Sequence, residues 1–346
     1  MSPPLEPDAQ PWPLARLDLN ESAYAPLPAV AAVLGDVMAE ANRYPDFLPD
    51  RTRADIAGHL GVPARQVTVG AGATGVALSA LQVCAQRAVA AGIRRPALVT
   101  ALPTFDGYPI LAEMVGLRVH GVPLAGDGSV DLDLLRAAVT DEVVAVVVCS
   151  PHNPTGSSVA PQALYEFIDA LPPHVLTVVD QAYVEFCDNP PDLHLLVDVR
   201  DDVLALRTFS KAYGLAALRV GYGIGDVGVV SQVRRHEVPF AVGPAAMAAV
   251  PVALAAEAEL AQRVRLMKSE RRRLADMLAA IGCPTLPSQA NFLFLPGPEG
   301  VAIGRLLRSC GVATKECEGH GMRITIGDRA GTDYVVQALR LTALTA

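Results

Sequence analysis

Residues 143–156 read Val-Val-Ala-Val-Val-Val-Cys-Ser-Pro-His-Asn-Pro-Thr-Gly, an apolar run that passes directly into a polar turn. A run with no polar position is typical of a strand that is buried on both faces of a sheet. Similar runs lie at 175–180 and 203–209, and they too end in polar residues. Ligands of open α/β sheets bind beyond the carboxyl ends of the strands, so these strand ends are the first candidates for a functional site.

Outward from these strands, short β-branched runs alternate with Ala- and Leu-rich stretches between about residues 66 and 225. The alternation predicts an α/β fold, with a mostly parallel mixed sheet flanked by helices on both faces. Helices are expected at 132–139 and 161–171. The expected strands are 66–69, 97–100, 118–122, 143–149, 175–180, 203–209 and 219–224.

The pattern changes after Gly225, where long helical stretches and fewer strands predict a smaller α+β domain. We expect a large domain over residues 29–243 and a small domain built from 1–28 and 244–346. Pro251 should begin or kink a helix. The elements expected after Gly225 are one or two helices over 244–281, strands at 291–295 and 322–326, and helices at 301–310 and about 333–341.

Composition excludes several classes of protein. The 346 residues are 51% hydrophobic and 18% charged, which is typical of a chain with a sizeable core. The net charge of -8 argues against a nucleic-acid partner. The six cysteines show no CxxC spacing and no accompanying histidine cluster, so neither a metal site nor a disulfide framework is expected.

The ends and the apolar stretches of the chain carry no targeting signal that we recognise. Residues 1–10 lack the basic and apolar regions of a signal peptide. The apolar stretch 244–256 is too short to span a bilayer and contains Pro251. We therefore expect a cytoplasmic protein with no membrane association.

Side chains at the strand ends match the requirements of pyridoxal 5′-phosphate (PLP). A lysine amine must bind the cofactor aldehyde and move a proton, and a carboxylate must pair with the pyridine nitrogen. Phenol and amide donors suit the ring oxygen O3′, and a cation, a hydroxyl and helix N–H groups suit the phosphate. The residues that supply these groups are Asn153, Asp180, Tyr183, Ser210, Lys211 and Arg219.

The order of these residues resembles that of fold type I PLP aminotransferases, and within them the histidinol-phosphate aminotransferase family. The resemblance covers roughly residues 17–343. Its matching segments are Leu-Asn-Glu at 19–21, Asn-Arg-Tyr-Pro-Asp at 42–46, Asn-Pro-Thr-Gly at 153–156, Asp-Gln-Ala-Tyr at 180–183, Arg-Thr-Phe-Ser-Lys-Ala-Tyr-Gly-Leu at 207–215, Arg-Val-Gly-Tyr at 219–222, Ser-Gln-Ala-Asn-Phe at 288–292 and Met-Arg-Ile-Thr-Ile-Gly at 322–327.

The resemblance implies roles for the residues that contact the cofactor. Lys211 would form the Schiff base, Asp180 would pair with the pyridine nitrogen, and Tyr183 would bond O3′; these three are the expected catalytic residues. Further cofactor contacts are implied for Asn153 at O3′, for Phe105 stacked on the ring, and at the phosphate for Ser210, Arg219 and the backbone N–H groups of Ala73 and Thr74.

On the substrate side, the resemblance implies that Arg323 binds a carboxylate or a phosphate, because an arginine fork suits either anion. Lys315, Asn20 and Tyr24 are further expected substrate contacts. Tyr44 would reach the cofactor phosphate of a neighbouring subunit, which implies a homodimer.

Three departures from the family bear on the substrate. Residues 1–16 contain no Pro-Tyr element, and Lys315 lies where the family usually has an arginine. Thr74 and Gln181 replace residues that are commonly acidic. The resemblance points first to histidinol phosphate, and so to histidine biosynthesis, while the departures favour an aromatic or other specialised amino acid. The amino acceptor would be a 2-oxo acid such as 2-oxoglutarate.

Other functions remain open at this stage. A decarboxylase of the threonine-phosphate type would share the cofactor motifs, because these motifs do not report which substrate bond breaks. A PLP-binding transcription regulator would need a DNA-binding domain, for which the sequence before residue 17 leaves no room. Residues 70–75 fit the GxGxxG pattern of a dinucleotide site, but Arg94 and Arg95 lie where an acidic residue is expected.

Overall fold

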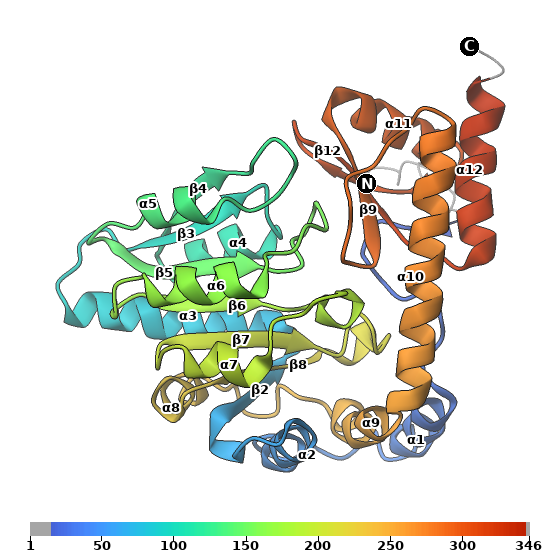
Figure 1. Ribbon diagram of the computed structural model, residues 1–346. Helices are drawn as coiled ribbons and strands as arrows, with labels where there is room; N and C mark the ends of the chain where they lie inside the picture. Colours follow the sequence, from blue (N-terminus) through green and yellow to red (C-terminus); the bar gives the residue numbers. More distant parts are fainter. Residues whose placement is uncertain (1–14, 344–346) are drawn as a thin grey trace, which may run out of the picture.

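The computed structural model describes residues 15–343, and a seven-stranded sheet forms its centre (Figure 1). Strand β8 runs antiparallel to both of its neighbours, and every other adjacent pair is parallel. The expected mostly parallel mixed sheet is confirmed. In spatial order the strands are β2 (Val67–Ala71), β8 (Val220–Gly225), β7 (Val203–Thr208), β6 (Leu176–Asp180), β5 (Val143–Cys149), β3 (Ala97–Leu102) and β4 (Arg118–Pro123).

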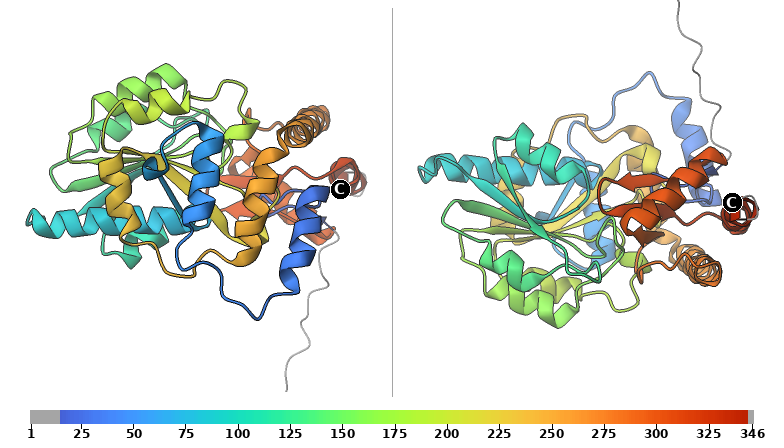
Figure 2. Two further views of the ribbon diagram at one scale, coloured as in Figure 1. Left: turned by 90° about the horizontal axis from the view of Figure 1, so that it is seen from below. Right: turned by 90° about the horizontal axis from the view of Figure 1, so that it is seen from above.

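Helices cover both faces of this sheet (Figure 2). Successive strand residues point to opposite faces, so Val147 packs with one helical layer and Val146 and Val148 pack with the other. One layer contains α3 (Gly72–Ala90), α4 (Gly107–Met114) and α8 (Val227–Arg234), and the other contains α5 (Leu132–Ala137), α6 (Pro161–Asp169) and α7 (Leu193–Asp198).

Helices α1 (Pro28–Met38), α2 (Asp50–Leu60) and α9 (Pro244–Ala255) pack into the same core as α5 to α7. The domain division at residue 243 stays a prediction, but packing with the central sheet continues beyond it through α9. The expectation that Pro251 begins a helix is wrong, because Pro251 lies inside α9, which begins at Pro244; a kink at Pro251 stays a prediction. The helix breaks at Ala256, whose φ of -93° and ψ of 40° leave the helical region, and α10 (Glu257–Ala280) then departs at 85°.

A smaller unit, made of two small sheets and two helices, lies at the far end of α10 (Figure 1). Its antiparallel sheet has the order β11 (Lys315–Cys317), β12 (Gly321–Thr325), β9 (Phe292–Pro296). The leading segment packs against this unit, as expected, because β1 (Ala15–Arg16) pairs with β10 (Val312–Ala313). The other elements are α11 (Gly297–Ser309), α12 (Arg329–Ala343) and the short turns η1 (Ala64–Gln66), η2 (Val184–Phe186) and η3 (Ala216–Leu218).

Within residues 15–343, no single helix is both long and apolar enough to cross a membrane. Helices α9 and α10 together meet the criteria of length and composition, but they are bent by 85° at their junction. Residues 1–14, which include the expected start of the small domain, lie outside the described part of the chain.

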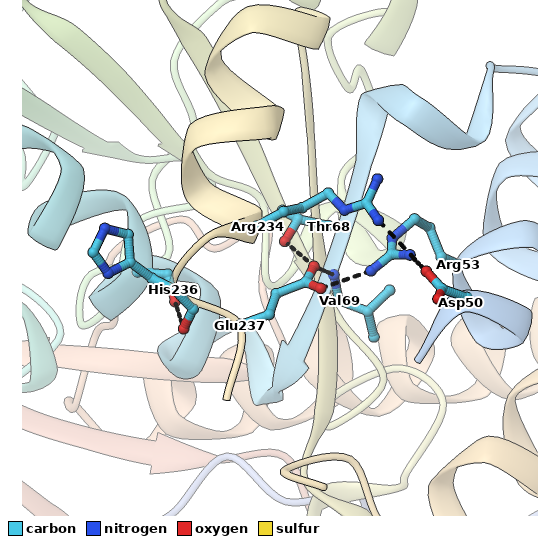
Figure 3. Close-up of polar contacts among 8 residues, drawn as sticks. Asp50, Arg53, Thr68, Val69, Arg234, His236 and Glu237 are labelled. Atoms are coloured by element: carbon cyan, nitrogen blue, oxygen red, sulfur yellow. Dashed lines mark hydrogen bonds and ion pairs between the residues drawn. The ribbon is translucent and has the colours of Figure 1, made fainter. Parts of the chain in front are cut away.

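A buried ion pair holds the edge strand β2 to helix α2 (Figure 3). Arg53 of α2 donates to Glu237 over 2.7 Å, and the two side chains are only 3% and 4% exposed. The second oxygen of Glu237 accepts from the Thr68 hydroxyl at 2.8 Å and from the Val69 N–H at 3.3 Å. Glu237 therefore joins α2, strand β2 and the segment after α8 in one place.

Replacing Glu237 with Gln should lower the free energy of unfolding by about 3 kcal/mol, because Arg53 stays buried without its main counter-charge. Asp50 also contacts Arg53 but is 68% exposed, so Asp50→Asn is the matched control and should change stability by less than about 1 kcal/mol. Urea titrations at one protein concentration measure both. Equal losses in the two variants would contradict this account of the ion pair.

Candidate active site

A cavity of about 380 Å³ lies at the carboxyl ends of β5, β6 and β7, and residues of the smaller unit close its other side. It brings together most of the site residues expected from the sequence. These are Asn20, Ala73, Thr74, Phe105, Asn153, Asp180, Tyr183, Ser210, Lys211, Arg219, Lys315 and Arg323.

Lys211 follows β7 directly and points into the cavity, where its amine is removed from most solvent. The Nζ donates to the carbonyl oxygens of Leu19 at 3.0 Å and Asn20 at 3.1 Å. Burial, and then the nearby charge of Arg323, lower the pKa of Lys211 to about 8. The amine is therefore neutral in an appreciable fraction of molecules near physiological pH, which suits both a nucleophile and a proton carrier.

Asp180 ends β6 and is fixed by two hydrogen bonds. The Tyr108 hydroxyl donates to Oδ2 at 2.6 Å, and the Ala182 N–H donates to Oδ1 at 2.9 Å. Burial raises the pKa of Asp180, and these hydrogen bonds act in the opposite direction. Sequence reasoning missed Tyr108. Tyr108 lies in the first turn of α4, three residues after Phe105, and its contact with Asp180, 72 positions away, has no local signal in the sequence.

The first turn of α3 forms a pocket for an anion. Ala73 and Thr74 lie at the helix start, where free backbone N–H groups attract negative charge. Gly72 has a φ of +74°, and a Cβ there would lie 2.4 Å from the guanidinium of Arg219. The absence of a side chain at Gly72 thus lets Arg219 reach the helix start. Arg219 also donates to the Ser210 hydroxyl at 3.4 Å.

Arg323 of β12 is buried, being 7% exposed, and carries an unsatisfied donor. One terminal nitrogen donates to Asn153 Oδ1 at 2.6 Å, and the other donates to the carbonyl oxygen of Asp18. Its Nε has no hydrogen-bond partner among the described residues. Because its acceptors among the described residues are neutral, the Arg323 guanidinium leaves a positive charge on the cavity wall, which suits an anion such as a carboxylate.

Asn20 holds Tyr183 in place from the opposite wall. Its amide nitrogen donates to the Tyr183 hydroxyl at 2.9 Å, and its amide oxygen accepts from the Thr325 hydroxyl at 3.0 Å. Burial raises the pKa of Tyr183 to about 12, so the phenol keeps its proton at neutral pH. Asn20, expected to contact substrate, is therefore also a positioning residue for Tyr183.

Tyr24 and Tyr44 were expected at the site but do not line the cavity. The ring of Tyr24 lies 5.7 Å from the Arg263 guanidinium and packs against the cluster that contains Phe186. Tyr44 is 85% exposed, and its ring contacts Phe240 with centroids 5.1 Å apart.

Two further expected site residues, Phe105 and Lys315, do line the cavity. Lys315 belongs to the smaller unit, and Phe105 precedes α4 on the side of the central sheet. The Phe105 ring meets Tyr108 edge-on at 5.8 Å, and Tyr108 in turn bonds Asp180. Lys315 of β11 forms an ion pair of 2.7 Å with Asp106, the residue that precedes α4.

Residues 13–339 match the family model described as aminotransferase class I and II. The chain belongs to this family. An aromatic amino acid aminotransferase from Thermobifida fusca is 41% identical, with 90% of this chain and 86% of the relative covered. A second relative with that name, from Nocardia farcinica, is 38% identical, with 90% and 87% covered.

Among solved structures, histidinol-phosphate aminotransferase from Sinorhizobium meliloti in complex with pyridoxal 5′-phosphate is similar to this chain. Its TM-score is 0.83 and its identity is 28%, with 96% of this chain and 92% of that chain covered. This class I and II aminotransferase is accordingly a PLP enzyme of fold type I, as the sequence predicted.

The cavity fits the cofactor. The anion pocket at α3 suits its phosphate, and Gly72 leaves room there that a Cβ would fill. The buried Asp180 carboxylate suits a protonated pyridine nitrogen, and the Lys211 amine suits the aldehyde. Asn153, Tyr183 and Phe105 also line this cavity. A single PLP molecule can therefore meet all of these groups of the aminotransferase at once.

Replacing Tyr108 with Phe should move the acidic limb of the kcat profile to higher pH by about one unit. The change removes a charge-assisted hydrogen bond, and such bonds contribute about 1.5–3 kcal/mol. The pKa of Asp180 then rises, and its required negative charge is lost at a higher pH as the solution is acidified. Tyr165→Phe, which removes a hydroxyl bonded to the Asp192 carbonyl, is the control. An unshifted acidic limb in Tyr108→Phe would refute this role.

Proposed function

We propose that this enzyme transfers the amino group of an aromatic amino acid to a 2-oxo acid such as 2-oxoglutarate. The main support for the proposal is that eight relatives, which are 35–41% identical to this chain, are all named aromatic amino acid aminotransferase. The make-up of the cavity supports it. Arg323 lines the cavity as a cation with no carboxylate partner among the described residues, and the apolar side chains of Leu19, Phe105 and Leu111 line the same space.

The roles of the residues follow from their positions. PLP, when bound, withdraws electrons from the substrate Cα and so makes its proton acidic. Arg323 binds the α-carboxylate and orients the substrate, which is worth several orders of magnitude in rate. Lys211 would take the Cα proton on its Nζ and deliver it to the cofactor carbon that carried the aldehyde, as a pKa of about 8 allows. Asp180, held by Tyr108, maintains the positive charge that the reaction needs at the ring nitrogen.

Histidinol phosphate is the second candidate substrate, because the similar solved enzyme from Sinorhizobium meliloti is named for it. Arg323 would then bind the phosphate. Lys315, the nearest cation on the same wall, is already paired with Asp106, which favours a substrate without a phosphate.

Mixing PLP-loaded enzyme with single amino compounds in the absence of an acceptor tests the proposal. Phenylalanine and tyrosine should convert the cofactor absorbance to that of its amine form at least about tenfold faster than histidinol phosphate does. Faster conversion by histidinol phosphate would reverse the assignment, and release of carbon dioxide would indicate a decarboxylase. Lys211→Ala should reduce the conversion by about 10³-fold or more, whereas Lys268→Ala, outside the cavity, should not.

We also propose that the enzyme is a homodimer in which Tyr44 reaches the neighbouring cavity. Tyr44, Phe47 and Phe240 are 85%, 60% and 43% exposed, and the Phe240 ring contacts each of the other two at a centroid distance of 5.1 Å. An exposed aromatic patch of this kind marks an interaction surface. The Phe240 N–H donates to the Phe47 carbonyl at 3.0 Å, which holds the patch together.

Phe240→Asp should place a charge in this patch and shift the enzyme from dimer to monomer at micromolar concentration, as measured by analytical ultracentrifugation. Leu195→Asp is the matched control, because Leu195 is also exposed, at 60%, but lies on α7, apart from the patch. A Phe240→Asp variant that remains dimeric would show that the patch is not the interface.

A further inference from the structure

Asn20 is a buried residue whose polar groups are all hydrogen-bonded within the site. It is 1% exposed, and its φ of 54° lies in the left-handed region, which asparagine tolerates better than most residues. Its backbone N–H donates to the Thr325 hydroxyl at 2.9 Å, and its backbone carbonyl accepts from Asn291 Nδ2 and from Lys211 Nζ, each at 3.1 Å. Its side-chain amide lies between two hydroxyl groups, those of Tyr183 and Thr325.

Thr325 determines which way this amide faces. Thr325 is 1% exposed, and its hydroxyl oxygen already accepts the Asn20 backbone N–H. Its one hydrogen needs an acceptor, and the acceptor that the described residues provide is Asn20 Oδ1 at 3.0 Å. If the amide were turned over, Nδ2 would face the Thr325 oxygen, and the buried hydroxyl hydrogen would be left without an acceptor at a cost in free energy. The amide oxygen therefore faces Thr325, and the amide nitrogen faces Tyr183.

This orientation decides the role of the Tyr183 hydroxyl. Asn20 Nδ2 can only donate, so the Tyr183 oxygen accepts at 2.9 Å and its own hydrogen stays free. No acceptor within residues 15–343 takes that hydrogen, since the nearby Asp180 carboxylate receives its hydrogen bonds from Tyr108 and Ala182. Tyr183 lines the cavity, so its hydrogen is available to a ligand there.

We propose that Asn20 and Thr325 are positioning residues that make Tyr183 a hydrogen-bond donor to the bound cofactor. The ring oxygen O3′ of PLP is bonded beside the carbon that bears the aldehyde, so it accompanies the nitrogen of Lys211. That nitrogen lies 5.8 Å from the centre of the Tyr183 ring. A hydrogen bond donated to O3′ stabilises negative charge on this oxygen, and so lowers the pH at which the bound cofactor loses its proton. The inference concerns the cofactor and holds for any amino substrate.

The relay reaches the cofactor from the smaller unit. Thr325 lies two positions after Arg323 on β12, so the two side chains are on the same face of the strand. One face of β12 therefore carries the cation proposed for the substrate carboxylate and, through Asn20, the hydroxyl that sets the hydrogen bond to the cofactor.

A pH titration of the absorbance of PLP-loaded enzyme tests the relay without turnover. Asn20→Asp keeps the size of the side chain and its tolerance of the left-handed region but presents only acceptors, so the Tyr183 hydrogen turns toward position 20 and away from the cofactor. The midpoint of the titration should rise by about one pH unit, the shift that loss of a charge-assisted hydrogen bond produces. Thr325→Val leaves both orientations of the amide populated and should raise the midpoint by a smaller amount.

A double-mutant cycle separates the direction of the hydrogen bond from the added charge of Asn20→Asp. In a Tyr183→Phe background the phenol hydrogen is already absent, so Asn20→Asp should shift the midpoint less than it does in the wild-type background. The other charged groups that line the cavity, Asp18, Glu21 and Asp180 among them, are the same in all these variants.

Thr332→Val is the matched control for Thr325→Val. Thr332 is 0% exposed, and its hydroxyl has no hydrogen-bond partner in the described part of the chain. Its replacement should leave the midpoint where it is in the wild-type enzyme. Urea titrations establish that each variant is folded before its midpoint is compared.

Equal shifts from Asn20→Asp in the two backgrounds would overturn the proposal, because the effect would then be one of charge alone. An unshifted midpoint in folded Thr325→Val would also overturn it, since the amide would then hold its orientation without the threonine. If Asn20→Asp does not fold, the comparison of Thr325→Val with Thr332→Val, made with and without Tyr183→Phe, decides the question.

Discussion

Burial of the central strands is the constraint on which the remaining structure depends. Strand β5 has no exposed residue, and β6 and β7 are buried along almost their whole length. Such strands can present reactive groups only where they end, and parallel pairing brings these ends to one edge of the sheet. The same burial gives the groups their chemistry, because desolvation raises the pKa of Asp180 and lowers that of Lys211.

The smaller unit completes this edge through backbone as well as side chains. The Leu17 N–H bonds to the Ala313 carbonyl at 3.0 Å, and the Leu17 carbonyl accepts from the Thr325 N–H at 2.9 Å. This pairing lays Leu19 and Asn20 across the cavity, where their carbonyl oxygens accept from the Lys211 amine. The leading segment therefore connects the wall that carries Arg323 to the lysine that follows β7.

The cofactor side and the substrate side of the cavity are built from different elements. The anion pocket at α3 and the Asp180 carboxylate suit the two ends of one cofactor, and neither depends on the substrate side chain. The opposite wall carries Lys315 and Arg323, which are direct partners across β11 and β12 and have different acceptors.

The sequence alone determined the sheet, the cofactor and the residues that follow the strands, because strand periodicity and short motifs are local properties of the chain. It left open whether Pro251 begins or kinks a helix, and it did not place the end of that helix at Ala256. Nor did it predict that Tyr108 bonds Asp180 or that Asp106 pairs with Lys315. Those partners are 72 and more than 200 positions apart in sequence, so only the tertiary structure, by folding distant segments onto one edge, decided their contacts.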